Sequence, residues 1–509
     1  MKIKAISLTD FRAFPGPAPT TFELDGKNLL VYGENGSGKS SLFYALRGLF
    51  SYTTPPNLLD LRNSFSGTGM GNVRVHVEFD DRTAVAWEVG AGKLRSANTL
   101  AKYMFVGPIA VAVHPGHTEP VNVQVREASK FSAMLDYRSL LNTNYKHGDD
   151  AINLFEPVVV ELLSGFVDLA TNKTILELWR SVQNSLPTTN NYKQISNALT
   201  ITGQFNAAMK RAIALLLPEA QTILKQLCPN GLKLLDLPFD GVRYNSAKAL
   251  RDKAYVDKVI GLQVSFRDIE VDRPQQYLNE ARLSALALAL YLGARLACTP
   301  QTTHHLKLLV LDDVLVGLDH SNRLPVLNVL KDHFPDWQIV LLTHDRGWFD
   351  LARHHLAPKD WTCYEIYEGD PAARAPMPLV RKTENRPAKA LLAKGRELLA
   401  LGYVEAAANY TRQAFEYGLR GGCEFQKVKL NYKVDSKDHQ AQDLLDAINK
   451  APTPASVSHA DWSACLQQIE LFKKVVMNPY SHPSAPNIPR QEVIDAANAV
   501  ETFLTLAGK

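Results

Sequence analysis

The chain has 509 residues, 46% apolar and 21% charged, which is ordinary for a globular protein and predicts two to four domains. No apolar run approaches about 18 residues, and Met1 to Ile6 has the pattern of a strand rather than a signal peptide, so we expect no membrane span. Five scattered cysteines without a Cys-x-x-Cys pair argue against a zinc site and for reduced thiols in the cytoplasm, while the net charge of +4 neither requires nor excludes nucleic acid.

The first 32 residues alternate between apolar and polar residues, as β-hairpins do. The run Asp10-Phe11-Arg12-Ala13-Phe14 lies between the predicted strands. A short apolar run from Asn28 to Tyr32 then predicts a buried strand. Taken by itself, Arg12 has the character of an ordinary surface arginine.

The buried strand leads into a complete G-x-x-x-x-G-K-[ST] phosphate loop, and an amphipathic helix follows it. In this order, the glycines let backbone N–H groups surround phosphate oxygens at a helix N-terminus. Lys39 can contact the β- and γ-phosphates of ATP, and the Ser40 hydroxyl can bind Mg²⁺. A Gly/Ser-rich turn without function would not need the flanking strand and helix. The predicted nucleotide-binding residues of this motif are Gly33, Asn35, Gly36, Ser37, Gly38, Lys39, Ser40 and Ser41.

The middle of the chain changes pattern twice. Residues 71–113 alternate in three stretches separated by polar turns, which predicts an antiparallel sheet. Residues 150–228 are mostly helical by pattern, with a break after Pro187 and an expected kink at Pro218, and residues 231–270 return to strands. We interpret the helical part as a hairpin that reaches about 50 Å. A plain helical subdomain without a partner is the alternative.

Two further apolar runs end at polar residues. Residues 308–311 predict a buried parallel strand that stops at Asp312 and Asp313, which is a Walker B pattern. In this pattern Asp312 would hold Mg²⁺, and Asp313 would orient or activate the attacking water. Residues 338–343 predict a second buried strand that ends at His344. A lone histidine in that place would more often be a packed or surface residue.

The order of these motifs resembles that of the ABC-type ATPases of the RecF/SMC group, and the resemblance covers about residues 1–370. It implies that Arg12 lies close to the nucleotide and that His344 contacts the γ-phosphate. It also implies that two heads sandwich two ATP molecules, as a homodimer or a higher oligomer. Asn279, at the start of a long helix, and Asp319, in a Gly-Leu-Asp turn, correspond to the signature and the D-loop, which act across that dimer.

The sequence departs from the group at several positions. Asp313 stands where a catalytic Glu is usual, which predicts slower hydrolysis, and no glutamine is identified for the Q-loop expected near residues 130–137. A carboxylate at Glu280 is unfavourable beside a phosphate. Read alone, the signature segment is a helix with an Asn N-cap, and the D-loop is an ordinary turn. The last four signature positions hold Asn279, Glu280, Ala281 and Arg282.

The last third of the chain changes character after a stretch rich in proline and glycine. Residues 369–386 show no periodicity and are interpreted as a linker, and five helical segments follow. His482, in a loop after a long helix, resembles the histidine of HEPN domains, some of which are RNases. No Arg precedes His482 at the spacing of that RNase motif, so we interpret the helices as an interaction module and His482 as a loop-packing residue.

We therefore predict an α/β fold, namely an ABC-type P-loop ATPase head with a short helical hairpin insertion, plus a C-terminal α-helical bundle. The boundaries fall between two ATPase lobes, the hairpin, the linker and a partner-binding domain. The predicted ranges are 1–149, 150–228, 229–368, 369–386 and 387–509.

The short insertion and the extra helical domain most resemble the PtuA ATPases of Septu anti-phage systems, which work beside a separately encoded HNH nuclease, PtuB. The resemblance implies a cytoplasmic regulatory subunit that binds and hydrolyses ATP with Mg²⁺ and controls an HNH-type nuclease partner, with nucleic acid as a further partner. One alternative is a RecF-like DNA-repair ATPase that binds DNA. Another is a HEPN-like RNase.

Overall fold

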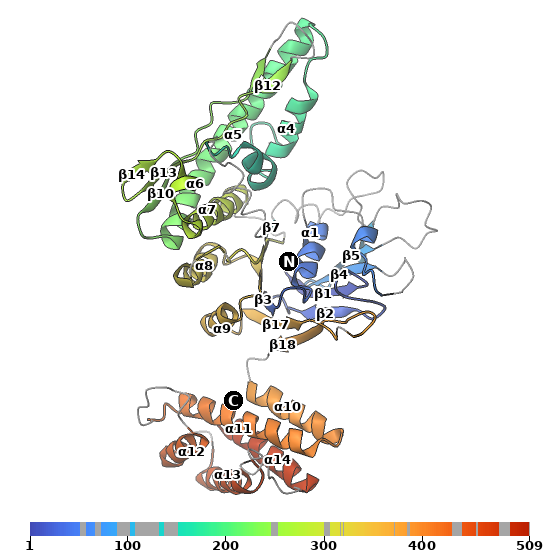
Figure 1. The fold of residues 1–509 in the computed structure, drawn as a ribbon, viewed down its shortest axis with the longest axis vertical. Coiled ribbons are helices and arrows are strands. Elements are labelled where there is room, and N and C mark those ends of the chain that lie inside the picture. Colours follow the sequence, from blue (N-terminus) through green and yellow to red (C-terminus); the bar gives the residue numbers. More distant parts are fainter. Residues whose placement is uncertain are drawn as a thin grey trace. The chain divides into compact units, whose positions relative to one another are not determined.

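The computed structural model divides the chain into two compact units, Met1–Lys382 and Thr383–Lys509 (Figure 1). Each unit has its own buried apolar core. The described residues are 1–50, 58–66, 73–88, 102–106, 132–136, 151–245, 253–299, 306–315, 317–318, 320–370, 372–383, 387–429, 440–454, 457–477 and 489–507.

A six-stranded sheet of order β18-β17-β3-β16-β15-β7 forms the centre of the first unit. The neighbouring strands from β17 to β7 are parallel. Every residue of β15 and β16 is buried, which explains why both read as continuous apolar runs in the sequence. The strands are β3 (Asn28–Gly33), β7 (Ala133–Asp136), β15 (Leu308–Asp312), β16 (Gln338–Thr343), β17 (Trp361–Tyr367) and β18 (Leu379–Thr383).

A second, antiparallel sheet has the order β2-β1-β4-β5-β6, and α1 (Lys39–Phe50) shares one buried cluster with strands of both sheets. Gly48 permits a close approach here, because a Cβ on it would lie 1.9 Å from a ring carbon of Trp87. β4 and β5 confirm the alternation predicted for residues 73–79 and 84–88, β6 was not predicted, and residues 109–113 lie outside the described residues. The strands are β1 (Ile3–Thr9), β2 (Thr20–Glu23), β4 (Arg74–Phe79), β5 (Ala84–Glu88) and β6 (Lys102–Val106).

The insertion contains one long helix, α5 (Tyr192–Leu227, 36 residues), beside a much shorter one, α4 (Ile175–Asn184). At 1.5 Å per residue, α5 spans about 54 Å. Pro218 lies inside this helix, and the kink expected there stays a prediction. Smaller elements flank the two helices: η2 (Pro157–Leu162), β8 (Val167–Asp168), β9 (Lys173–Thr174), β10 (Leu232–Asp236), β11 (Arg243–Asn245), β12 (Ala254–Val256), β13 (Gln263–Phe266) and β14 (Ile269–Val271).

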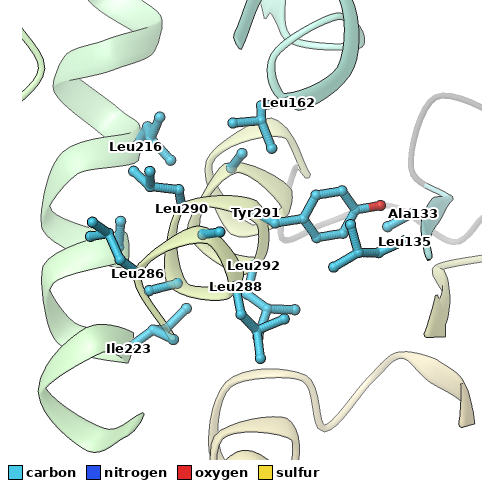
Figure 2. Close-up of a cluster of buried hydrophobic side chains, with 14 of the residues drawn as sticks. Ala133, Leu135, Leu162, Leu216, Ile223, Leu286, Leu288, Leu290, Tyr291 and Leu292 are labelled. Carbon is cyan, nitrogen blue, oxygen red and sulfur yellow. The ribbon is translucent and has the colours of Figure 1, made fainter. Parts of the chain in front are cut away.

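After a single turn, α6 (Pro274–Tyr277), the core helix α7 (Glu280–Cys298) is apolar on all sides. Figure 2 shows Leu286 and Leu290 against Leu216 and Ile223 of α5 on one side, and Tyr291 directed toward Ala133 and Leu135 of β7 on the other. Among the described residues, α7 alone has the length and hydropathy of a membrane-crossing helix, and 83% of that window is buried in the protein. A helix that is hydrophobic all round requires such enclosure.

The remaining elements of the first unit complete the central sheet. A single turn of 3-10 helix, η1 (Leu58–Leu61), lies near the first strands in the fold, and α8 (His320–His333) and α9 (Arg346–His355) follow β15 and β16. The linker predicted for residues 369–386 was wrong for β18, which pairs as the edge strand of the sheet. The prolines around this strand led to its interpretation as a linker. An edge strand tolerates nearby prolines and needs no strong apolar pattern, because its place is set by backbone pairing.

The second unit consists of helices, as the sequence predicted. Its core contains Phe415, Trp462 and Phe503, and the Trp462 and Phe503 rings stack at 6.0 Å. The predicted fourth helix changes to a π-helix, η5, over its last five residues. His482 lies outside the described residues. The elements are α10 (Pro387–Ala400), α11 (Val404–Phe425), α12 (Ala441–Lys450), α13 (His459–Phe472), η5 (Lys473–Met477) and α14 (Arg490–Leu506).

Candidate nucleotide-binding site

The phosphate loop connects the end of β3 to the first residue of α1, as its motif requires. Gly36 and Gly38 have φ of +87° and +105°, a region in which a side chain is strained. At Gly33, a Cβ would lie 2.4 Å from the Ser37 Oγ. The glycines of the motif are therefore needed for the backbone path itself.

Lys39 lies under this loop with a side chain that is 5% exposed. Its Nζ donates to the carbonyl oxygens of Gly33 at 2.6 Å and Glu34 at 3.2 Å, and lies 3.9 Å from the Asp313 Oδ2. Burial lowers the pKa of the Lys39 ammonium, and the carboxylates of Asp313 and Asp312 offset part of this effect. The ammonium is held at the C-terminal edge of the sheet by groups that a phosphate can replace.

Asp312 is the last residue of β15, beside the first turn of α1. Burial, and then the neighbouring Asp313, raise the pKa of Asp312 to about 6, while a hydrogen bond with the Ser40 side chain works against this shift. The buried Asp312 Oδ1 has no hydrogen-bond partner among the described residues. A buried carboxylate oxygen without a partner, beside a hydroxyl, fits Mg²⁺, which usually takes one or two protein ligands besides phosphate and water.

Asp313 and His344 form a pair at the ends of β15 and β16. The Asp313 Oδ1 accepts hydrogen bonds from the His344 backbone N and from its Nδ1, both at 2.9 Å. Asp313 has a φ of +53°, and its backbone N donates to the Leu342 carbonyl oxygen at 3.0 Å, which fixes this bend. A proton on Nδ1 leaves the His344 Nε2 as an acceptor, with no hydrogen bond to any described residue.

Arg12 lines the same cleft as the phosphate loop, so the structure favours the position that the resemblance implied over that of a distant surface arginine. Its guanidinium carbon lies 4.1 Å from the centroid of the Tyr44 ring, and its Nε is buried without a partner among the described residues. Ser41 joins this loop to α1, since its Oγ accepts from the Ala13 N at 3.3 Å.

The loop around Arg12 is fastened to residues 61–66. The Arg12 N donates to the Leu61 carbonyl oxygen at 2.7 Å, and the Asn63 side chain donates to the Arg12 carbonyl oxygen at 2.7 Å. The buried carboxylate of Asp10 pairs with Arg62 at 3.2 Å. Residues 61–66 thus form one wall of the cleft, although they belong to no sequence motif.

The cleft has a volume of about 540 Å³, large enough for a nucleotide. At its rim, Phe65 is 65% exposed. Glu368, Gly369, Pro376 and Pro378 also line it, although the sequence placed three of them in a linker. The predicted residues that line it are Arg12, Asn35, Gly36, Gly38, Lys39, Ser40, Ser41 and Asp313.

Of the other predicted residues, Gly33 and Ser37 belong to the phosphate loop, Asp312 and His344 lie at the ends of β15 and β16, and Asn279 lies elsewhere. Asn279 is the N-cap of α7, where its Oδ1 accepts from the Arg282 N at 3.1 Å, and it does not line this cleft. Asp319 lies outside the described residues. Gly317, two residues earlier, packs so closely on α7 that a Cβ would lie 2.4 Å from the Ser284 Oγ. Residues 133–136, within the expected Q-loop, form the strand β7 instead.

Comparisons with known proteins place this site in a class. Residues 5–106 match the family model described as an AAA domain, and no curated protein matches the chain. Residues 5–106 are thus similar to an AAA domain, and with the phosphate loop and the parallel sheet the chain has a P-loop ATPase head fold, mixed α/β with added C-terminal helices. ATPases of this kind use ATP with Mg²⁺.

Solved structures with a similar fold include SMC heads and RecF. The SMC head bound to the C-winged helix domain of ScpA is 11% identical, with a TM-score of 0.44 over 76% of this chain and 99% of that one. The Pyrococcus furiosus SMC head bound to the C-terminal domain of ScpA is 13% identical, with a TM-score of 0.44 over 78% and 99%. The recombination mediator RecF with ATP is 14% identical, with a TM-score of 0.45 over 75% and 98%.

Proposed function

We propose that this chain binds ATP with Mg²⁺ in the cleft and hydrolyses it to ADP and phosphate. The observation that carries the proposal is the convergence of Lys39, Asp312 and the Asp313–His344 pair at the ends of the adjacent strands β3, β15 and β16. Ligands of open α/β sheets bind outside the carboxyl ends of the strands, and this cleft lies there.

Each residue has a distinct part in this chemistry. Lys39 exchanges its two carbonyl partners for phosphate oxygens and neutralises charge on the β- and γ-phosphates. Ser40 and Asp312 would hold Mg²⁺, which would neutralise phosphate charge. Asp313 orients the attacking water and accepts its proton, while His344, held by Asp313 through its Nδ1, places its ring beside the γ-phosphate.

Phosphate release by the purified chain tests this proposal. We expect turnover that requires Mg²⁺ and falls to background when EDTA removes it. The variant Asp312→Asn keeps the side-chain volume but loses the charge, so it should need a much higher Mg²⁺ concentration. Magnesium-independent turnover, or an unchanged magnesium requirement in Asp312→Asn, would contradict the assignment of this residue.

We also propose that two heads sandwich two ATP molecules. Asn279 lies outside the cleft of its own chain, and its exposed position at the start of α7 leaves it available to a second subunit. Light scattering with a slowly hydrolysed ATP analogue tests this idea. The mass should double with the analogue in wild type and respond less in Asn279→Ala. A mass that stays at one subunit, with no oligomer before addition, would refute it.

We propose further that the ATPase regulates an HNH-type nuclease in an anti-phage complex of the Septu type. The second unit supports this proposal, because it has its own core and exposes Tyr417 and Phe425 on α11. Deleting residues 385–509 should leave ATP binding nearly intact and abolish both nuclease association and phage protection. Nuclease association that survives the deletion would move the docking surface to the head.

A RecF-like ATPase that binds DNA without a nuclease is the second candidate, since the resemblance of the motifs is to the RecF/SMC group as a whole. An HNH nuclease encoded in the adjacent gene would favour the defence complex. ATP-dependent binding of DNA by the purified chain, with no nuclease gene nearby, would favour the RecF-like function. RNA cleavage that is lost in His482→Ala would instead indicate an RNase.

A further inference from the structure

A second cleft, of about 660 Å³, lies at the opposite edge of the central sheet. Its lining includes Asn28, Ile339 and Trp361, which lie at or near the starts of β3, β16 and β17. The same three strands end beside the phosphate loop, His344 and Glu368. This cleft shares no lining residue with the nucleotide cleft, so a ligand in it would be separate from the ATP described above.

Four lysines give this cleft an excess of positive charge. No ion pair or side-chain hydrogen bond joins any of their ammonium groups to another residue in the described part of the chain. Two acids also line the cleft, and Asp25 is held by Lys382, which lies 3.8 Å away. Asp360 is the other acid. The four lysines are Lys2, Lys27, Lys331 and Lys359, and we name the cleft that they line the lysine cleft.

Helix stability accounts for only one of these lysines. Lys331 lies in the last turn of α8, where a positive charge offsets the helix dipole. Lys2, Lys27 and Lys359 lie outside helices, just before β1, β3 and β17. Three cations from separate segments therefore meet Lys331 at one place, and self-repulsion among them is relieved by an anion.

The other side of the cleft is apolar and well packed. Leu330, Phe334 and Trp361 line it and are 1%, 1% and 8% exposed. Lysine is a common phosphate ligand and acts as a point charge, while an apolar wall suits a flat organic group. We propose that the lysine cleft binds a phosphate ester of about mononucleotide size, either a free nucleotide or the phosphorylated end of a nucleic-acid strand.

Calorimetry on the full-length Lys39→Ala variant tests this proposal, because that change weakens the ATP site. The probes are AMP, a pentathymidylate with a 5′-phosphate and the same oligonucleotide without it. The test variant adds Lys331→Glu and Lys359→Glu, both at exposed positions. The matched control adds Lys193→Glu and Lys225→Glu, two exposed lysines of α5 outside the cleft, so that the net charge is the same.

We expect binding of at least one phosphorylated probe, and an affinity at least about tenfold lower in the test variant than in the control. AMP binding identifies a free nucleotide, whereas binding of the phosphorylated oligonucleotide alone identifies a strand end. If the charge reversals unfold the protein, Lys359→Gln replaces them with the same expected direction. Binding that is equal in test and control variants, or absent for every probe up to about 1 mM, would overturn the proposal.

Discussion

The head and the C-terminal unit differ in what their buried charged side chains contact. In the head, Lys39 and Asp312 are 5% and 7% exposed and meet at one cleft, where an oxygen of Asp312 lacks a partner among the described residues. In the C-terminal unit, the buried Lys473 donates to the Gln442 side-chain oxygen. Charges buried with incomplete partners indicate a ligand, whereas internally bonded ones indicate packing.

The two buried lysines allow the sharpest test of this difference. Lys39→Ala should lower phosphate release by at least about 10³-fold, because the transferred phosphoryl group loses its main protein cation. Lys473→Ala removes a lysine of similar burial from the C-terminal unit and should leave turnover within about twofold, while lowering the melting temperature of its own unit. Equal losses of turnover in the two variants would erase the distinction between the units.

Asp313→Ala should separate ATP binding from hydrolysis. We expect phosphate release to fall by roughly 10²- to 10³-fold, since both the water contact and the hydrogen bond that fixes His344 are lost. ATP affinity should remain near that of wild type, because Lys39 and Asp312 stay in place, and the ATP-bound dimer should persist. Asp446→Ala, an exposed carboxylate of α12, serves as the control. Wild-type turnover in Asp313→Ala would place the base elsewhere.

The raised pKa of Asp312, about 6 in the folded chain against an ordinary value near 4, makes two effects of pH run in opposite directions. The folded state binds the proton more tightly than the unfolded state, so the nucleotide-free head should become more stable as pH falls from 7 toward 4. Below pH 6 the proton competes with Mg²⁺, and magnesium-dependent ATP binding should weaken by about tenfold per pH unit. Asp312→Asn should remove both trends, as melting curves and ATP titrations from pH 5 to 8 would show.

Three glycines give the smallest effects. Gly48→Ala should destabilise the head by about 1–3 kcal/mol, because the new Cβ meets the rigid, fully buried Trp87 ring. Gly418→Ala in the C-terminal unit meets the Leu504 Cδ2 at 2.5 Å, the movable end of a side chain, and should cost less. Gly203→Ala in α5 has open space and should stabilise its helix by about 0.5–1 kcal/mol. Urea unfolding of each unit gives the order, and a larger effect at Gly418 than at Gly48 would contradict it.

The motifs that the sequence revealed are those in which local chemistry restricts the residue type. The phosphate loop needs glycine at positive φ, and β15 and β16 are covered on both faces, so their apolar runs stand out. The pairing of Asp313 with His344 follows from two neighbouring parallel strands, which the sequence could place only through a family resemblance.

Other parts of the site depend on contacts between distant segments and leave no local pattern. Asn63 and Phe65 reach the cleft because residues 61–66 bond to the loop around Arg12. The short strand β7 occupies a sheet edge through backbone pairing with β15, and its four residues carry no periodic signal long enough to identify it. Such positions are set by tertiary hydrogen bonds rather than by residue type.

The enclosure of α7 has a mechanical consequence. A helix packed around its whole circumference cannot rotate about its axis without opening voids on every side, so it moves together with its neighbours. Asn279, the N-cap of α7, thus lies at the end of a rigid helix that shares one core with the 36-residue α5. We expect a load applied at Asn279 by a second subunit to shift α5 along its length. The ATP state would then set the position of the long helix α5.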